Sequence, residues 1–259
     1  MSNRHWPPSQ LIELRSSGRR AQLLGLSTDL IAESIRRDGG FESSLAEMAM
    51  EQLQAQPPGT VIDVGANIGS FAIALALNAP DFRLLCFEAQ RLVAYQLAGA
   101  VALNGLASVH VFHQAVGDTL GDIEITAPDY AIEPNVGAMS LDSDINALRG
   151  ATTQGARERV RMVTLDSLDV TDLRLLKVDV EGMELNVLKG SERLLARNGF
   201  PPILAECWQN DWFSDHRAAL VAWFELHGYV LKQHGDNYLA THRSRPVRPQ
   251  MPPVPRPWV

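Results

Sequence analysis

Residues 60–71, Thr-Val-Ile-Asp-Val-Gly-Ala-Asn-Ile-Gly-Ser-Phe, constrain the fold more than any other part of the chain. The apolar, β-branched start of this segment is typical of a buried strand, and an apolar helix is expected over residues 72–77. A strand, a glycine turn and a helix in this order are typical of nucleotide-binding sites in parallel sheets. We therefore expect Gly65 and Gly69 to let the backbone approach a ligand, and Gly65→Val to block binding without unfolding the protein.

The composition of the turn indicates which nucleotide it binds. Asn67 stands where a dinucleotide-binding turn needs its middle glycine, and the Gly-Lys-Ser/Thr ending of a phosphate-binding loop is absent. The next apolar run, residues 83–87, ends at Glu88, whose carboxylate can accept both hydroxyls of a ribose. Asp63 lies in the first strand and needs hydrogen-bond donors, which a cofactor ammonium or backbone amides would supply. These features favour S-adenosylmethionine over a nicotinamide dinucleotide.

The predicted cofactor-binding residues lie in the glycine turn and at the ends of successive strands. Asp118 follows the third apolar run and is placed to bond the adenine amino group, although it could serve only as a turn former. The full predicted set is Asp63, Gly65, Ala66, Asn67, Gly69, Ser70, Glu88, Asp118 and Asp179.

Five motifs lie within residues 60–207. They are Val-Ile-Asp-Val-Gly-Ala-Asn-Ile-Gly-Ser-Phe (61–71), Cys-Phe-Glu-Ala (86–89), Ala-Val-Gly-Asp (115–118), Val-Thr-Leu-Asp-Ser-Leu (163–168) and Leu-Lys-Val-Asp-Val-Glu-Gly-Met-Glu-Leu-Asn-Val-Leu-Lys-Gly (176–190). In these motifs the chain resembles the FkbM family of S-adenosylmethionine-dependent methyltransferases. The last motif is the most specific. The resemblance implies a Rossmann-like, seven-stranded class I methyltransferase that acts on a hydroxyl of a sugar, polyketide or other secondary metabolite. It does not name the acceptor.

Strand and helix signals alternate along the chain, which predicts an α/β fold with a mostly parallel, doubly wound sheet. Two short apolar runs around Gly235 read as a hairpin that forms an antiparallel edge. We divide the chain into an N-terminal helical cap (1–56), a methyltransferase domain (57–242) and a proline-rich C-terminal arm (243–259). In the cap, Ser44 to Glu47 forms a capping box. Phe41 and Glu42 could contact cofactor or acceptor, but a helix with a packing role alone is favoured.

The predicted catalytic residues are carboxylates at the ends of neighbouring strands. Asp179 closes the fourth strand, Glu181 follows in the turn, and Glu206 closes the fifth strand. Since the carboxyl ends of parallel strands share one edge, we expect these groups to converge on the acceptor as a general base. A divalent cation bound by them is an alternative, but it is not favoured and no residue is assigned to a metal. Glu184, at the start of the next helix, is compatible with a helix-terminal charge.

Residues 132–148 show no clear period and form the longest such segment. Long loops in compact domains are usually functional or disordered. If this loop is functional, it covers the acceptor, with Asn135 and Ser140 as polar contacts and Met139 as adaptable apolar surface.

Charge and composition limit the partners. The formal net charge of −7 argues against a nucleic-acid acceptor. Cys86 and Cys207 end two apolar runs, as expected of buried thiols in a reducing compartment, and no apolar run or leader suggests a membrane. The sequence thus predicts a cytoplasmic monomer or homodimer acting on a small molecule. N-methylation of a small molecule and a non-catalytic, cofactor-binding protein stay open as alternatives.

Overall fold

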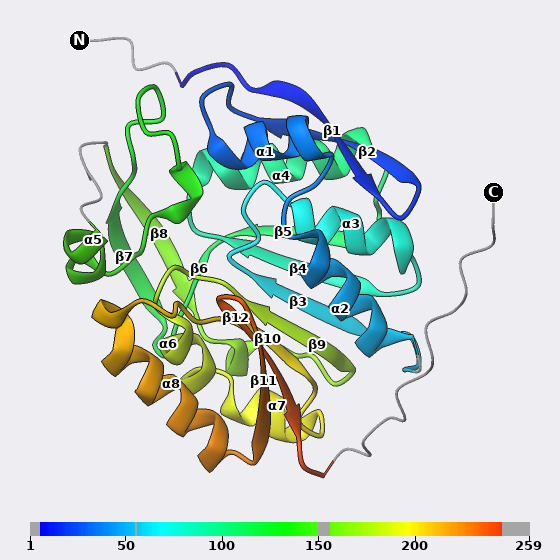
Figure 1. The fold of residues 1–259 in the computed structure, drawn as a ribbon, viewed down its shortest axis with the longest axis vertical. Coiled ribbons are helices and arrows are strands. Elements are labelled where there is room, and N and C mark those ends of the chain that lie inside the picture. The colour runs from blue at the N-terminus through cyan, green and yellow to red at the C-terminus, as the bar shows by residue number, and fades with distance from the viewer. Residues whose placement is uncertain (1–5, 55, 150–155, 245–259) are drawn as a thin grey trace.

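A seven-stranded β-sheet forms the centre of the molecule (Figure 1). The computed structural model describes residues 6–54, 56–149 and 156–244. From edge to edge the strands are β11 (Tyr229–His234), β12 (Asn237–His242), β10 (Ile203–Glu206), β9 (Leu173–Val178), β3 (Thr60–Val64), β4 (Arg83–Glu88) and β5 (Val109–His113). Strands β10, β9, β3, β4 and β5 are parallel, whereas β12 is antiparallel to both β10 and β11. The predicted parallel sheet with an antiparallel edge hairpin is confirmed.

Helices cover both faces of this sheet, because both faces of its central strands are apolar. Along β3, Val61 belongs to the hydrophobic core on one face, and Ile62 and Val64 belong to the core on the other. The first face is covered by α2 (Ser43–Leu53), α3 (Ser70–Asn78) and α4 (Arg91–Leu103), and the second by α6 (Glu184–Lys189), α7 (Glu192–Arg197) and α8 (Ser214–Leu226). The sheet is therefore doubly wound, which leaves the carboxyl ends of its parallel strands open to a ligand.

The N-terminal segment corrects the prediction of an all-helical cap. Residues 10–25 form an antiparallel hairpin of β1 (Gln10–Ser16) and β2 (Arg19–Gly25), and only α1 (Leu30–Asp38) and α2 are helical. The reason is a period-two pattern: Ile12 and Leu14 are buried between more exposed neighbours, and the hairpin packs on α3 and α4. Helix α2 also begins at Ser43 with Glu42 as its N-cap, so the predicted capping box at Ser44 does not form.

A second, three-stranded sheet is a feature that the sequence did not predict. It pairs β6 (Ala115–Val116) in parallel and β7 (Gly121–Thr126) in antiparallel orientation with β8 (Arg157–Val163). The chain between β7 and β8 is the predicted loop, and it contains a 3-10 turn, η1 (Val136–Ala138), and a short helix, α5 (Ser143–Arg149). This connection lies near the carboxyl edge of the main sheet (Figure 1).

Two further 3-10 turns, η2 (Leu165–Ser167) and η3 (Asp211–Phe213), complete the described elements. Of the predicted C-terminal arm, residues 245–259 lie outside the described part of the chain. The predicted domain limits therefore stay predictions. Among the described residues, no helix has both the length and the apolar character needed to cross a membrane.

Candidate functional site

A cavity of about 410 Å³ lies along the carboxyl ends of the five parallel strands. Its floor comes from residues at or just after the end of each strand: 114–116 at β5, 88–90 at β4, 64–67 at β3, 177 and 179–181 at β9, and 206 and 208 at β10. The opposite wall comes from the segment 30–42 and from the loop 135–141. This volume is within the range of cavities that hold cofactor-sized ligands.

The glycine turn is shaped by close packing inside the protein. Gly65 has φ +77°, and a Cβ built on it would lie 1.7 Å from the carbonyl oxygen of Asp179 at the end of the neighbouring strand. The expectation that Gly65→Val would leave the protein folded is therefore wrong, because the valine side chain would collide with this backbone. Gly69 has φ +92° and packs against Leu97 of α4, and it does not line the cavity.

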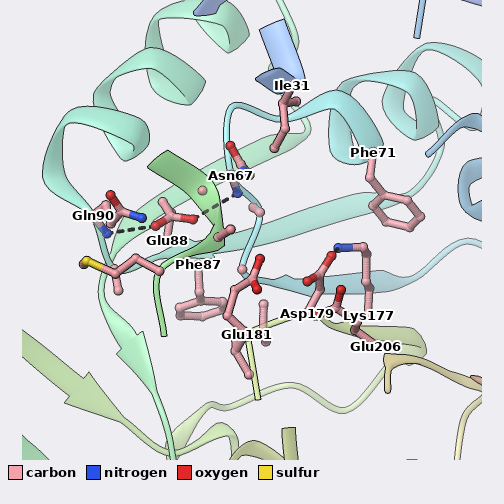
Figure 2. A pocket seen from close by; sticks show the side chains of 18 of the residues that line it. Ile31, Asn67, Phe71, Phe87, Glu88, Gln90, Lys177, Asp179, Glu181 and Glu206 are labelled. Atoms are coloured by element: carbon pink, nitrogen blue, oxygen red, sulfur yellow. Dashed lines mark hydrogen bonds and ion pairs between the residues drawn. The ribbon is translucent and has the colours of Figure 1, made fainter. Parts of the chain in front are cut away.

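Glu88 lies at one end of the cavity, as the strand-end argument predicts. Its Oε2 accepts a hydrogen bond from the Asn67 backbone N–H (3.0 Å), and its Oε1 accepts one from the Gln90 backbone N–H (2.8 Å) (Figure 2). Burial raises the pKa of Glu88 to about 7. Each carboxylate oxygen keeps a lone pair for a further donor, so both ribose hydroxyls could bind here.

Asp63 lies beneath the cavity and does not line it, contrary to the direct cofactor contact that we expected. Its side chain is fully buried, and Lys177 Nζ lies 3.7 Å from its Oδ1 and 2.8 Å from Asp179 Oδ2. Burial raises the pKa of Asp63 to about 6, although Lys177 opposes this shift. Burial alone would lower the pKa of Lys177, but the carboxylates of Asp179, Asp63 and Glu42 raise it above its ordinary value. Lys177 is therefore a buried cation that faces the cavity.

The three predicted catalytic carboxylates do converge. One oxygen each from Asp179, Glu181 and Glu206 lie within 4.8 Å of one another, and all three residues line the cavity. Glu206 Oε2 is enclosed and has no hydrogen-bond partner in the described structure. Burial raises the pKa of Glu206 well above its ordinary value, and the charges of Asp179 and Glu181 add to this effect. Such a cluster can take up a proton or bind a divalent cation through oxygen.

Two further side chains hold this cluster in place. Arg149 at the end of α5 lies 2.6 Å from Glu181 Oε2 and 4.4 Å from the ring of Trp208. Glu184 Oε1 accepts hydrogen bonds from the backbone N–H groups of Val180 and Gly182, both at 3.1 Å, so its role is to fix the turn that carries Glu181. Burial raises the pKa of Glu181 to about 8, and Asp179 adds to the shift while Arg149 opposes it.

The predicted acceptor loop covers the cavity, but only one of its two predicted polar contacts lines it. Asn135 is among the lining residues, and its Oδ1 is enclosed without a hydrogen-bond partner in the described structure. Ser140 is buried inside the loop, where its hydroxyl accepts a bond from the Asp142 N–H (3.1 Å). Met139 does line the cavity. The loop is tied down because Gln90 Nε2 donates to the Val136 carbonyl (2.7 Å).

The structure thus brings together nine of the predicted site residues, which are Gly65, Ala66, Asn67, Ser70, Glu88, Asn135, Asp179, Glu181 and Glu206. Asp63, Gly69, Asp118 and Ser140 are not among the lining residues. Asp118 is exposed, and its Oδ2 accepts a hydrogen bond from Asn186 Nδ2 (3.3 Å).

Sequence reasoning missed several lining residues: Gln90, Gln114, Arg149, Lys177 as a site residue, and Trp208. Gln90 and Trp208 each follow a strand-end glutamate by two positions, and this shared spacing could have indicated them. Arg149 had no signal in the sequence, because its contact with Glu181 joins segments that are 32 residues apart.

The buried carboxylates give a prediction for stability. Burial raises the pKa of Glu42, Glu88 and Glu184 to about 7, of Asp63 to about 6 and of Glu181 to about 8. The folded protein therefore holds protons that the unfolded chain has lost, so the contribution of these groups to stability is fully present below about pH 4 and is lost as pH rises toward 8. We expect the ligand-free melting temperature to be higher at pH 6 than at pH 8 by roughly 4 °C or more, measured by calorimetry. A melting temperature that stays level or rises over this interval would contradict the prediction.

Comparison with known proteins gives one family match. Residues 63–231, well over half of the chain, match the Methyltransferase FkbM domain. Methyltransferase sdnD of Sordaria araneosa is 26% identical over 180 residues, which span 58% of this chain and 66% of that protein, slightly under two thirds.

Among solved structures, similar folds include a putative caffeoyl-CoA O-methyltransferase from Staphylococcus aureus (7% identity, 83% of this chain and 91% of that chain, TM-score 0.48). A precorrin-6y C5,15-methyltransferase from Geobacter metallireducens is also similar (14% identity, 77% and 88%, TM-score 0.45).

Proposed function

The chain belongs to the FkbM methyltransferase family, and on that premise we propose that it transfers a methyl group from S-adenosylmethionine to a hydroxyl of a sugar, polyketide or other secondary metabolite. The observation that carries this proposal is the cavity itself. It has a ribose acceptor, Glu88, at one end and the cluster of Asp179, Glu181 and Glu206 at the other, on the same edge of the sheet.

The residues present suit this cofactor. Glu88 would bind the ribose, and the chain at Gln114 to Val116, one strand further along the edge, would border the adenine. Asn67 has φ +51°, which turns its backbone N–H toward Glu88 and fixes the carboxylate for the ribose. The bound cofactor would supply a methyl group that its sulfonium already activates. The protein then has to position the acceptor and receive the hydroxyl proton.

Glu206 is the proposed base. Lys177 holds a charge beside Asp179, and Arg149 holds one beside Glu181, so both of these carboxylates have a cationic partner. Glu206 Oε2 has no hydrogen-bond partner in the described structure, and its raised pKa makes it a stronger base than an ordinary carboxylate.

N-methylation is the second candidate, because the carboxylates and the ring of Trp208 would also suit an amine. Incubation of the protein with a cell extract and methyl-labelled cofactor, followed by mass spectrometry, tests both candidates. Fragmentation of the labelled product locates the added methyl group and distinguishes an oxygen from a nitrogen acceptor. Binding of the cofactor without a labelled product, under conditions where the extract contains the native acceptor, would favour a non-catalytic role.

Cofactor binding provides a separate prediction. Glu88→Ala removes the acceptor for the ribose hydroxyls and should weaken S-adenosylhomocysteine binding by roughly 1.5–3 kcal/mol, as expected for hydrogen bonds to a charged group. Titration calorimetry measures this loss, with the exposed Glu225→Ala on α8 as the matched control. Equal affinity in Glu88→Ala and wild type would place the ribose elsewhere.

A further inference from the structure

Glu42 is a cavity residue that the reaction described above does not use. It lies in the N-terminal segment, outside the family match at residues 63–231, yet its side chain lines the cavity. It is the N-cap of α2 but makes no side-chain capping bond. Its carboxylate forms no hydrogen bond or ion pair within the described part of the chain, so it is available to a ligand.

The backbone of Glu42 has a conformation that is uncommon for residues other than glycine. Its φ is +53°, in the left-handed region that side chains other than glycine rarely adopt. Two other residues in the cavity lining share this property, Asn67 (φ +51°) and Glu181 (φ +57°), and both belong to the predicted site. Strain of this kind persists where the surrounding structure imposes it, and it often marks a ligand contact.

The charges around Glu42 point to a cationic ligand. Lys177, Asp179 and Asp63 all lie near enough to act on its charge, so three carboxylates surround one lysine. Lys177 forms its ion pairs with Asp179 and Asp63, and it also lies over the ring of Phe71 (5.5 Å). Burial raises the pKa of Glu42 to about 7, which the positive charge of Lys177 only partly offsets. The corner of the cavity around Glu42 and Lys177 thus has three carboxylates and one lysine, and a cation that enters it would favour the ionised form of Glu42.

The position of the corner identifies that cation. Figure 2 shows Lys177 and Phe71 on the side of the cavity opposite Glu88 and Gln90. If Glu88 binds the ribose, the adenine extends toward β5 and the amino-acid chain of the cofactor extends in the other direction, toward this corner. That chain ends in an ammonium and a carboxylate. An ammonium would find an open carboxylate at Glu42, and the neighbouring carboxylate of the ligand could face Lys177.

We infer that Glu42 binds the ammonium group at the amino-acid end of S-adenosylmethionine, so that the segment before the family domain completes the cofactor site. This inference rests on the proposed function. It adds a binding residue that the strand-end pattern cannot supply, because Glu42 precedes the first strand of the main sheet.

The test uses two ligands that differ only in the ammonium. S-Adenosylhomocysteine carries the group, whereas its deaminated analogue keeps the adenosine, the thioether and the carboxylate. Glu42→Gln should weaken binding of S-adenosylhomocysteine about tenfold to a hundredfold, and should leave affinity for the deaminated analogue unchanged within about twofold. The exposed Glu47→Gln on α2 is the matched control and should change neither affinity.

A second variant covers the case in which glutamine disturbs the fold. Glu42→Gly removes the same carboxylate and relaxes the left-handed backbone, so it should keep or raise the melting temperature while losing affinity for S-adenosylhomocysteine alone. An equal loss for both ligands, or no loss for either, would overturn the role of Glu42 and leave the proposed function intact. Failure of the wild-type protein to bind either ligand would overturn the proposed function and this inference with it.

Discussion

Glu206→Gln is expected to slow methyl transfer by about two to four orders of magnitude, the usual contribution of a positioned general base. The amide keeps the shape of the side chain but cannot accept the hydroxyl proton. The affinity for S-adenosylhomocysteine should change little, since the lost interaction is made mainly in the transition state. Single-turnover rates with labelled cofactor measure the effect, and the exposed Glu225→Gln should stay within about twofold of wild type.

The pH dependence separates Glu206 from its neighbours. Turnover in wild type should rise as pH increases through the raised pKa of Glu206, because the base must be ionised. The pH–rate profile of wild type therefore has an ascending limb, which Glu206→Gln should lose. Asp179→Asn and Glu181→Gln should also slow transfer, but they should keep the limb and shift it to lower pH, because each removes a negative charge that raises the pKa of Glu206.

A bound metal would give a different result. If the cluster holds a divalent cation, a chelator should silence the wild type and added magnesium or manganese should restore it. With a simple base, chelation should have no effect. Wild-type turnover in all three amide variants would overturn the acceptor-side assignment altogether. The cluster would then be a structural ion network, and the loop around Asn135 would be the next place to look for the base.

The sequence predicted the central sheet well because most of its strands contain a short apolar run bounded by turn residues. The N-terminal hairpin was missed because its apolar residues are spread through a largely polar segment. Its buried residues, such as Ile12 and Leu14, alternate with polar ones, and the apolar signal within Gln10–Ser16 is therefore diluted. The small sheet of β6, β7 and β8 depends on pairing between residues far apart in the chain, such as Asp122 and Arg161, which no local pattern reveals.

The rule that ligands bind at the carboxyl ends of parallel strands located most of the site, because these ends lie together at one edge of the sheet. It could not determine what each residue touches. Gly65 looked like a gap for a ligand, but the space is filled by the backbone of Asp179 from the neighbouring strand. Asp63 looked like a cofactor contact, but its carboxylate lies 3.7 Å from the Lys177 ammonium of that strand, beneath the cavity. Both differences arise from β9 lying beside β3, a pairing that joins residues more than 100 positions apart.

Lys177→Met is expected to reduce the free energy of unfolding by about 3–5 kcal/mol at pH 8, as found when one partner of a buried ion pair is removed. Lys177 supplies the positive charge beside Asp63, which is fully buried and accepts no hydrogen bond in the described structure. Methionine fills a similar volume, so the loss would come from the uncompensated carboxylate and not from a cavity. Denaturant unfolding of the ligand-free protein measures it, with the exposed Lys189→Met on α6 as the control.

The pH and a second substitution identify the source of this loss. With Lys177 in place the pKa of Asp63 is already raised to about 6, and without the lysine it must rise further. Protonation of Asp63 then removes the buried charge, so the cost of Lys177→Met should shrink as pH falls from 8 to 5. Asp63→Asn combined with Lys177→Met should recover most of the stability at pH 8, because neither charge is then buried. A cost that is independent of pH and is not recovered by Asp63→Asn would mean that Lys177 stabilises the protein through its packing on Phe71, and that Asp63 finds its compensation elsewhere.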